Sequence, residues 1–400
     1  MNRLFDGRRA RRRLTAMCVA GIAAGVTALG LGSASFAAAQ TSVPCSAGGP
    51  GLVAAINTAN SSGGGTITLD KGCTYLLTSA NNSGPLGRNG LPVVTSRIVI
   101  DGRDATIAGN HTNFRIFQVN APNGDLTLEH LTLTGGAALA GPGPASGGGA
   151  LFNNEGIVTI KHGVVTDNVA GAGGGLASGS AQENANGPRG SLTIDHSLVS
   201  DNTSFGGGAG GVLNRAGSLT VAHSRITGNT APGGGGIATG PGNPSGTGSI
   251  TVIDHSQIDH NTANAPEESG GGGVANGGVL IVDHSAISDN TGPGLVGGGL
   301  LNHGSSATLD HSSVTGNTAA DGGGIANVSF PAEEGPPGPA PQLTLKHTDV
   351  TGNVATEVGG GIFNFSFGGP LGTVTLDHSN VSGNTPDNCF PPGTIAGCTG

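Results

Sequence analysis

Aromatic residues are scarce in this chain: they make up 3% of 400 residues, with no Trp and one Tyr. This scarcity weighs against a site that stacks sugars on aromatic rings. A helical fold is also disfavoured, because 78 Gly and 22 Pro fill a quarter of the chain and both types break helices. No strict three-residue glycine period occurs, which excludes a collagen triple helix. A disordered chain or a regular, turn-rich β architecture remains.

The N-terminus has the order of an export signal. Five arginines lie between Arg8 and Arg13, an Ala/Gly-rich apolar stretch covers residues 14–31, and small residues end at Ala37-Ala38-Ala39. This order predicts a cleaved secretory signal peptide over residues 1–39. A membrane anchor is the alternative, although glycines interrupt the stretch. No later apolar run approaches the length of a membrane span.

Removal of residues 1–39 makes the chain strongly acidic. Six of the 16 basic residues and one of the 25 acidic residues leave with this segment, so the net charge becomes −14. Nucleic acid and anionic membrane surfaces are therefore not expected as partners. Four cysteines remain, and an even number in an exported chain predicts disulfides with three possible connectivities, against the alternative of free buried thiols: Cys45, Cys73, Cys389 and Cys398.

One motif recurs from residue 126 to 385, with aliphatic residues around a histidine, as in LTIDHSLVSDN. Nine of the twelve histidines occupy the same column: His130, His162, His196, His223, His255, His284, His311, His347 and His378. An asparagine stands six residues after each of the last eight: Asn168, Asn202, Asn229, Asn261, Asn290, Asn317, Asn353 and Asn384. The distance between successive histidines varies, whereas this offset is constant. Fixed short segments joined by variable ones are typical of stacked coils.

The repeat predicts three short strands per coil, namely GGG-I-x-N, LT-[ILV]-DHS and [VI]-x-x-N-T. A single coil cannot bury an apolar face, but coils stacked about 4.8 Å apart pair their strands in parallel. Aliphatic residues then stack inside, and asparagines form hydrogen-bonded ladders at the bends. The sequence therefore predicts an all-β, single-stranded parallel β-helix of ten or eleven coils.

The segments GGGALFN, GGGVAN, GGGLLN, GGGIAN and GGGIFN, each followed by an x-x-N-x segment, resemble the repeat of chlamydial-type polymorphic outer membrane proteins. IVIDGRDATIAGN is similar to an early coil of the wider pectin-lyase-like superfamily, and AAINTAN with GGGTITLDKGCTYLLT resembles the entry of secreted bacterial β-helix proteins. The resemblance implies a right-handed β-helix with a short N-terminal capping helix. It is specific for the fold and weak for activity.

This fold implies four parts: the signal peptide (1–39), an N-terminal cap with the first coils (40–125), the repeats (126–385) and a C-terminal cap loop (386–400). Gly51–Ala59 is amphipathic and is the expected capping helix. A rod on the order of 50 Å long separates the two ends beyond disulfide reach. We therefore predict one disulfide per cap, Cys45–Cys73 and Cys389–Cys398.

Insertions follow the glycine cluster in several coils and are expected to emerge along one edge. They form either a ligand-contacting loop face or plain surface loops. Their chemically richest residues are Gln182, Glu183, Asn184, Arg189, Glu333 and Glu334.

The histidine column has two interpretations. In the first, it is a turn column kept in register by repetition. In the second, the imidazoles bind transition metals, or repel one another when protonated, beside a column of five aspartates, Asp195, Asp254, Asp283, Asp310 and Asp377. A row of imidazoles offers pairs rather than the closed sites of zinc. We therefore expect no metal and no cofactor, and interpret the aspartates as a solvated stripe.

The sequence favours a secreted, adhesin-like structural or binding solenoid, extracellular or attached to a cell surface, with a glycan or another surface protein as partner. The alternative is an extracellular polysaccharide lyase or glycoside hydrolase, which needs clustered carboxylates. Asp101, Arg103 and Asp104 are the one compact acid–base cluster, and a turn explains them more simply. We assign no catalytic residue.

Overall fold

The computed structural model describes residues 39–139, 146–179, 190–240, 249–264, 270–303, 306–331 and 339–399. They belong to one compact unit, Ala38–Gly400. The expected signal peptide lies almost wholly outside the described residues. The residues singled out in the insertions also lie outside them: Gln182, Glu183, Asn184, Arg189, Glu333 and Glu334.

Seven coils contain four strands each, one more than the repeat predicts. In one coil they are β14 (Leu176–Gly179), β15 (Ser191–Asp195), β16 (Leu198–Ser200) and β17 (Thr203–Ser204). A histidine separates the second strand from the third, and a ladder asparagine separates the third from the fourth. The two-residue fourth strand escapes sequence analysis because so short a segment carries no periodicity.

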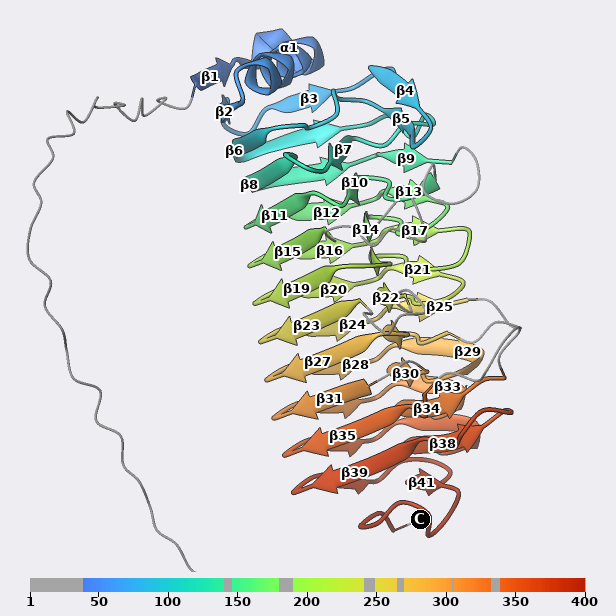
Figure 1. The fold of residues 1–400 in the computed structure, drawn as a ribbon. Helices are drawn as coiled ribbons and strands as arrows, with labels where there is room; N and C mark the ends of the chain where they lie inside the picture. The colour runs from blue at the N-terminus through green and yellow to red at the C-terminus, as the bar shows by residue number, and fades with distance from the viewer. Residues whose placement is uncertain are drawn as a thin grey trace, which may run out of the picture. The chain divides into compact units, whose positions relative to one another are not determined.

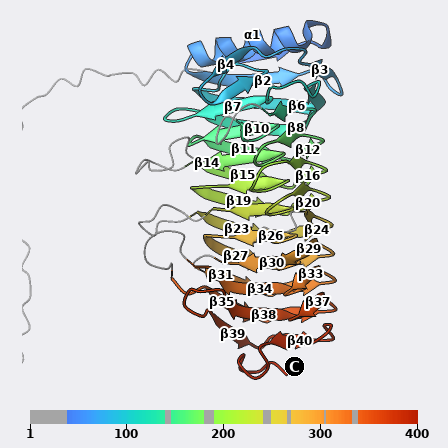
Figure 2. The same ribbon diagram turned by 90° about the vertical axis from the view of Figure 1, so that its right-hand side faces the viewer.

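Equivalent strands of successive coils pair in parallel and form three sheets along the unit (Figures 1 and 2). Sheet 1 has 21 strands in two limbs that meet at the histidine turn. Its first limb contains β1 (Ala39–Val43), β2 (Gly64–Leu69), β6 (Arg97–Ala108), β8 (Asp125–Thr134), β11 (Ile157–Lys161), β15, β19 (Ser218–Ala222), β23 (Ile250–Asp254), β27 (Val279–Asp283), β31 (Ser306–Asp310), β35 (Gln342–Lys346) and β39 (Thr373–Asp377). The long strands β6 and β8 continue into the second limb, which also contains β3 (Thr74–Leu76), β12 (Val164–Thr166), β16, β20 (Arg225–Thr227), β24 (Gln257–Asp259), β28 (Ala286–Ser288), β32 (Ser313–Thr315), β36 (Asp349–Thr351) and β40 (Asn380–Ser382).

Sheets 2 and 3 form the other walls. Sheet 2 has ten strands: β7 (Phe117–Asn120), β10 (Leu151–Asn154), β14, β18 (Val212–Asn214), β22 (Ile237–Thr239), β26 (Val274–Asn276), β30 (Leu300–Asn302), β34 (Ile325–Ser329), β38 (Ile362–Ser366) and β41 (Cys389–Phe390). Sheet 3 has eight: β9 (Ala137–Ala138), β13 (Val169–Ala170), β17, β21 (Thr230–Ala231), β25 (Thr262–Ala263), β29 (Thr291–Val296), β33 (Thr318–Asp321) and β37 (Val354–Val358). β4 (Asn82–Gly84) and β5 (Gly87–Asn89) form an antiparallel hairpin.

The predicted fold class is confirmed: the unit is an all-β, right-handed parallel β-helix. Eleven coils are counted along the first limb of sheet 1, from β2 to β39. The expected capping helix is α1 (Gly48–Ser61), which lies across the first coil (Figure 1) and buries Leu52, Ala55, Ile56 and Ala59. It covers the open end of the coil stack, whose apolar interior would otherwise face water. A short 3₁₀ helix, η1 (Cys45–Ala47), precedes it.

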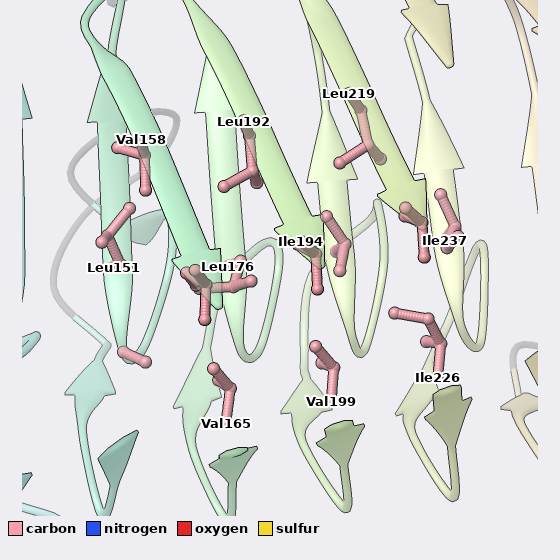
Figure 3. Close-up of a cluster of buried hydrophobic side chains, with 14 of the residues drawn as sticks. Leu151, Val158, Val165, Leu176, Leu192, Ile194, Val199, Leu219, Ile226 and Ile237 are labelled. Atoms are coloured by element: carbon pink, nitrogen blue, oxygen red, sulfur yellow. The ribbon is translucent and has the colours of Figure 1, made fainter. Parts of the chain in front are cut away.

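The core consists of aliphatic columns inside the coils. In β15 the burial alternates, so that Leu192 and Ile194 point inward, and their neighbours in β19 are Leu219 and Val221 (Figure 3). Each buried aliphatic side chain contributes about 1.5–3 kcal/mol. A one-residue slip would turn the whole set outward, so the alternation fixes the register between coils.

The asparagine ladder, the eight asparagines after the histidine column, lies at the corner between sheets 1 and 3. Along the series from Asn168 to Asn384, each backbone N–H and each Nδ2 donates to the Oδ1 of the next coil's asparagine at 2.9–3.1 Å. Seven of the eight are fully buried, and Asn384 is 8% exposed. The ladder thus satisfies backbone groups that leave the strand pairing at a corner.

Connections of variable length occur at two corners rather than along the one expected edge. Between sheets 2 and 1, eleven residues separate β14 from β15, whereas three separate β18 from β19. Between sheets 3 and 2, twelve residues separate β9 from β10, whereas five separate β13 from β14. This second corner has a signal in the sequence, the variable spacing between the ladder asparagine and the next glycine cluster: eight residues separate Asn261 from Gly270, whereas four separate Asn317 from Gly322.

Candidate functional site: the histidine ladder

The nine repeated histidines stand at the turn between the two limbs of sheet 1 and form the histidine ladder. All nine have a positive φ between 44° and 49°. Few residue types other than glycine accept this left-handed conformation, and histidine is among those that occur there more often. The turn directs each imidazole outward: the side chains of His196, His223, His255, His284, His311 and His347 are 47–53% exposed.

A column of hydroxyl residues directly after the histidines holds the turn in place. The Oγ of Ser224 accepts the backbone N–H of Ser197 at 3.0 Å and donates to the carbonyl of Ala222 at 2.6 Å. The same arrangement recurs at Ser256 and Ser285. Sequence analysis missed this second polar ladder, although the repeated His-Ser pair was its signal. It fixes the backbone from which the imidazoles project.

Successive imidazoles stack on one another along the ladder except His162 and His196, whose rings are tilted by 43°. Ring centroids of successive histidines lie 4.6–5.4 Å apart. This spacing follows from the distance between paired strands, about 4.8 Å. The two shortest separations, 4.6 Å, join His196 to His223 and His311 to His347.

The aspartates in front of the histidines are not the free solvated stripe that the sequence suggests. In each of five coils, an aspartate Oδ1 lies 2.7–2.8 Å from the Nδ1 of the histidine that follows it; the aspartates are Asp195, Asp254, Asp283, Asp310 and Asp377. Their side chains are 31–50% exposed. Each carboxylate therefore orients one imidazole ring.

Two carboxylates also reach the next coil. Asp195 Oδ1 lies 3.7 Å from His223 Nδ1, and Asp310 Oδ1 lies 3.7 Å from His347 Nδ1. An aspartate thus lies beside the imidazole pair at these two places. The ligand atoms of each such group of three lie within 4.8 Å of one another.

A shallow groove follows the middle of the ladder. Its lining includes His162, His196, His223, His255 and Arg225. The Arg225 Nε donates to both carboxylate oxygens of a neighbouring buried residue, Asp259, at 2.9 and 3.1 Å. The groove is shallow and open to solvent, and imidazole rings and the Arg225 side chain line it.

The cysteines are joined within each cap. Cys45 pairs with Cys73, with Cα atoms 5.7 Å apart, and Cys389 pairs with Cys398, with Cα atoms 6.3 Å apart. The first disulfide lies beside the capping helix and the second ties the last strand to the C-terminal loop. Each disulfide thus lies at one end of the stack of coils, where no further coil pairs with the strands.

The early acid–base cluster is a bend within a strand. In β6 the pairing with β8 shifts between Asp101 and Ala105, and the two residues at the bend, Arg103 and Asp104, have φ values of 51° and 64°. The carboxylate of Asp104 lies 3.8 Å from the Lys71 ammonium. This bend occupies the place that the histidine turn takes in later coils.

Sequence analysis also missed a second asparagine series, on the inner side of sheet 2. Asn276 donates to Asn302 at 2.8 Å, Asn302 to Asn327 at 2.7 Å, and Asn327 to Asn364 at 2.8 Å. The asparagine that closes the GGG-x-x-N segment was visible as a signal. Its role depends on stacking between coils, which one coil's sequence does not show.

Two titratable groups outside the ladder are perturbed by their surroundings. Arg115 is fully buried with its guanidinium carbon 5.0 Å from the Phe152 ring centroid, and burial lowers its pKa to about 9. Burial also lowers the pKa of His303, which packs edge-on against Phe330 at 6.0 Å. Neither residue belongs to a column of the repeat, so the periodicity of the sequence did not predict its burial.

No protein-family model and no curated protein sequence matches the chain. Among solved structures, it is similar to the A-module of mannuronan C-5 epimerase AlgE6 from Azotobacter vinelandii, at 13% identity and a TM-score of 0.38, covering 86% of this chain and 95% of that one. It is also similar to PfbA, a surface adhesin of Streptococcus pneumoniae, at 11% identity and a TM-score of 0.39, covering 86% and 93%. Similarity at this level assigns neither family nor activity.

Proposed function

We propose that the chain is a secreted, adhesin-like β-solenoid with a structural or ligand-binding role, extracellular or attached to a cell surface. Disulfides at both ends fit an oxidising compartment, and residues 1–39 have the order of a signal peptide. No helix in the described part of the chain is long and apolar enough to span a membrane. We also propose that the rest of the chain consists of an N-terminal cap with the first coils (40–125), the repeats (126–385) and a C-terminal cap loop (386–400).

The observation that carries this proposal is the regular outer face of sheet 1. Coil-to-coil pairing places partly or fully exposed threonines in one column, interrupted by Val252 and Ile281: Thr127, Thr159, Thr193, Thr220, Thr308, Thr344 and Thr375. The histidine ladder runs parallel to it. Hydroxyl and imidazole groups repeated about every 4.8 Å present the same contact many times, which suits a repetitive ligand such as a glycan chain.

The resemblance to the chlamydial-type surface-protein repeat supports the same role. A glycan is the partner class that we favour, since the threonine hydroxyls and imidazoles of the face match sugar hydroxyls as hydrogen-bond partners. Nucleic acid is disfavoured by the net charge of −14 that remains without residues 1–39.

Binding to an array of extracellular polysaccharides and to whole cells tests the proposal. Lysines at Thr193 and Thr308 should weaken binding at least about tenfold, because each places a long charged side chain on the face. Thr203 and Thr318 are equally part-exposed threonines of sheet 3 and provide the matched lysine control, which should leave binding unchanged. Equal loss from both pairs, or no binding to any glycan or cell, would refute a contact face on sheet 1.

The alternative function, polysaccharide lyase or glycoside hydrolase, is tested on the same panel. Product formation is followed with and without Ca²⁺ by reducing-end and unsaturated-product assays. The binding proposal expects no turnover, and robust turnover of any polysaccharide would replace it with an enzymatic function.

A further inference from the structure

Two groups on the histidine ladder each bring a carboxylate between two imidazoles. Group 1 is Asp195, His196 and His223, and group 2 is Asp310, His311 and His347. In both groups the carboxylate Oδ1 lies 2.8 Å from Nδ1 of the first histidine and 3.7 Å from Nδ1 of the second. The same geometry thus arises independently in two separate parts of the rod.

The sequence explains why it arises there. In the coil of the second histidine, the residue before it is Ala222 in group 1 and Lys346 in group 2, so this imidazole has no aspartate of its own coil. Its Nδ1 faces the aspartate of the preceding coil instead. The shortest ring separations of the ladder, 4.6 Å, occur in these two groups.

His130 and His162 also follow one another on the ladder, but no carboxylate is shared between them in this way. There the acidic residue is Glu129, whose carboxylate lies 3.7 Å from the Lys161 ammonium in the next coil. Two further groups, centred on Asp254 and Asp283, reuse His223 and His311 and so compete with groups 1 and 2 for the same imidazoles.

We propose that groups 1 and 2 are binding sites for a borderline divalent transition-metal ion, represented by Zn²⁺. Two imidazole nitrogens and one carboxylate oxygen are the donors that such ions prefer, whereas Ca²⁺ and Mg²⁺ prefer oxygen donors alone. Bonds of about 2.0–2.2 Å in a tetrahedron require donor atoms about 3.3 Å apart. The carboxylate–imidazole distances of 2.8 and 3.7 Å bracket that value.

Small rotations of exposed side chains complete the geometry. The side chains of His196 and His223 are 50% and 47% exposed, so an ion from solvent can reach them. Neutral histidine binds a metal ion through Nδ1 when its proton resides on Nε2. Solvent water supplies the fourth ligand, and the buried serine column keeps the turns in place.

The test measures Zn²⁺ stoichiometry on the full chain without a polyhistidine tag, by equilibrium dialysis and elemental mass spectrometry, with isothermal titration for affinity. D195N and D310N each remove one carboxylate and preserve its size. D377N is the matched control, because Asp377 lies 2.7 Å from the Nδ1 of its own histidine, His378, and no further histidine coil follows. Far-UV circular dichroism verifies that every variant is folded.

The competing groups are removed first, by D254N and D283N together, which leaves groups 1 and 2 intact. We expect two Zn²⁺ per chain for the native sequence, for D377N and for this background. In the same background we expect one Zn²⁺ after D195N or D310N is added, and none for the double variant that carries both. Loss of one ligand should weaken its site at least about tenfold. Ca²⁺ should not bind at either group. Absence of Zn²⁺ binding by the native chain, equal loss in D377N, or full retention by the double variant would overturn the proposal.

Discussion

Replacement of one ladder asparagine tests what holds the corner between sheets 1 and 3. Asn290 is fully buried in the middle of the rod. Its Oδ1 accepts the backbone N–H and the Nδ2 of Asn261, each at 3.0 Å, while its own Nδ2 donates to the Ile258 carbonyl at 2.8 Å and to Asn317 Oδ1 at 3.0 Å. Asn290→Ala removes all four hydrogen bonds and leaves the Asn261 N–H without its acceptor.

At about 1 kcal/mol for each buried hydrogen bond, the expected loss in the free energy of unfolding is about 4 kcal/mol. Urea unfolding followed by far-UV circular dichroism measures it, together with amide hydrogen exchange at Asn261 and Asn317. The matched control is Asn380→Ala, an exposed asparagine whose Nδ2 donates to Ser382 Oγ at 3.0 Å. It should cost no more than about 0.5 kcal/mol.

The result that would refute this reasoning is a loss for Asn290→Ala below about 1 kcal/mol, or one equal to that of the control. Unchanged exchange at Asn261 would likewise show that its amide does not depend on the side chain of the next coil. In either case the aliphatic columns alone would hold the coils together.

Three further outcomes are expected. Gly272→Ala should cost about 2–4 kcal/mol because its Cβ would meet backbone atoms of the neighbouring coils, whereas Gly207→Ala has nothing within 4 Å and should change stability little; equal melting temperatures would contradict this. Burial lowers the pKa of His303, so the stability that its neutral imidazole contributes is present above its unfolded pKa of about 6.5 and is lost as the pH falls. The melting temperature of His303→Gln should therefore fall less between pH 7.5 and pH 5.5 than that of the native chain. Parallel curves of melting temperature against pH would refute this. Burial, and after it the charge of Glu357, raises the pKa of Asp321, so the stability that its protonated carboxyl contributes is present below its unfolded pKa of about 3.9 and is lost as the pH rises. Asp321→Asn should therefore raise the melting temperature at pH 7 but not at pH 3. No gain in melting temperature at pH 7 would contradict this.

Most of the fold was predictable because its signals are short and repeated. The aliphatic residues two before and three after each histidine predicted the buried columns, and the amphipathic stretch within α1 predicted the cap. The two-residue strands of sheet 3, such as Thr203–Ser204, were not predictable, since pairing between coils rather than local pattern defines them.

The candidate site, too, was only partly predictable from the sequence. The sequence showed that a histidine and an aspartate stand side by side in several coils, but not that the Asp195 carboxylate also faces His223, 28 residues later. It also gave no sign of the Arg115 environment, which depends on Phe152 from another coil.

The sequence by itself determined the coil, its inward columns and its histidine and asparagine turns, because covalent geometry fixes which side of a strand or turn each residue occupies. Only the tertiary structure decided which side chains meet across coils, because variable connections separate them in sequence while strand pairing brings them within about 5 Å. The His–Asp–His groups belong to that second kind. Groups 1 and 2 exist where one coil lacks an aspartate and the stacking of coils supplies that of its neighbour.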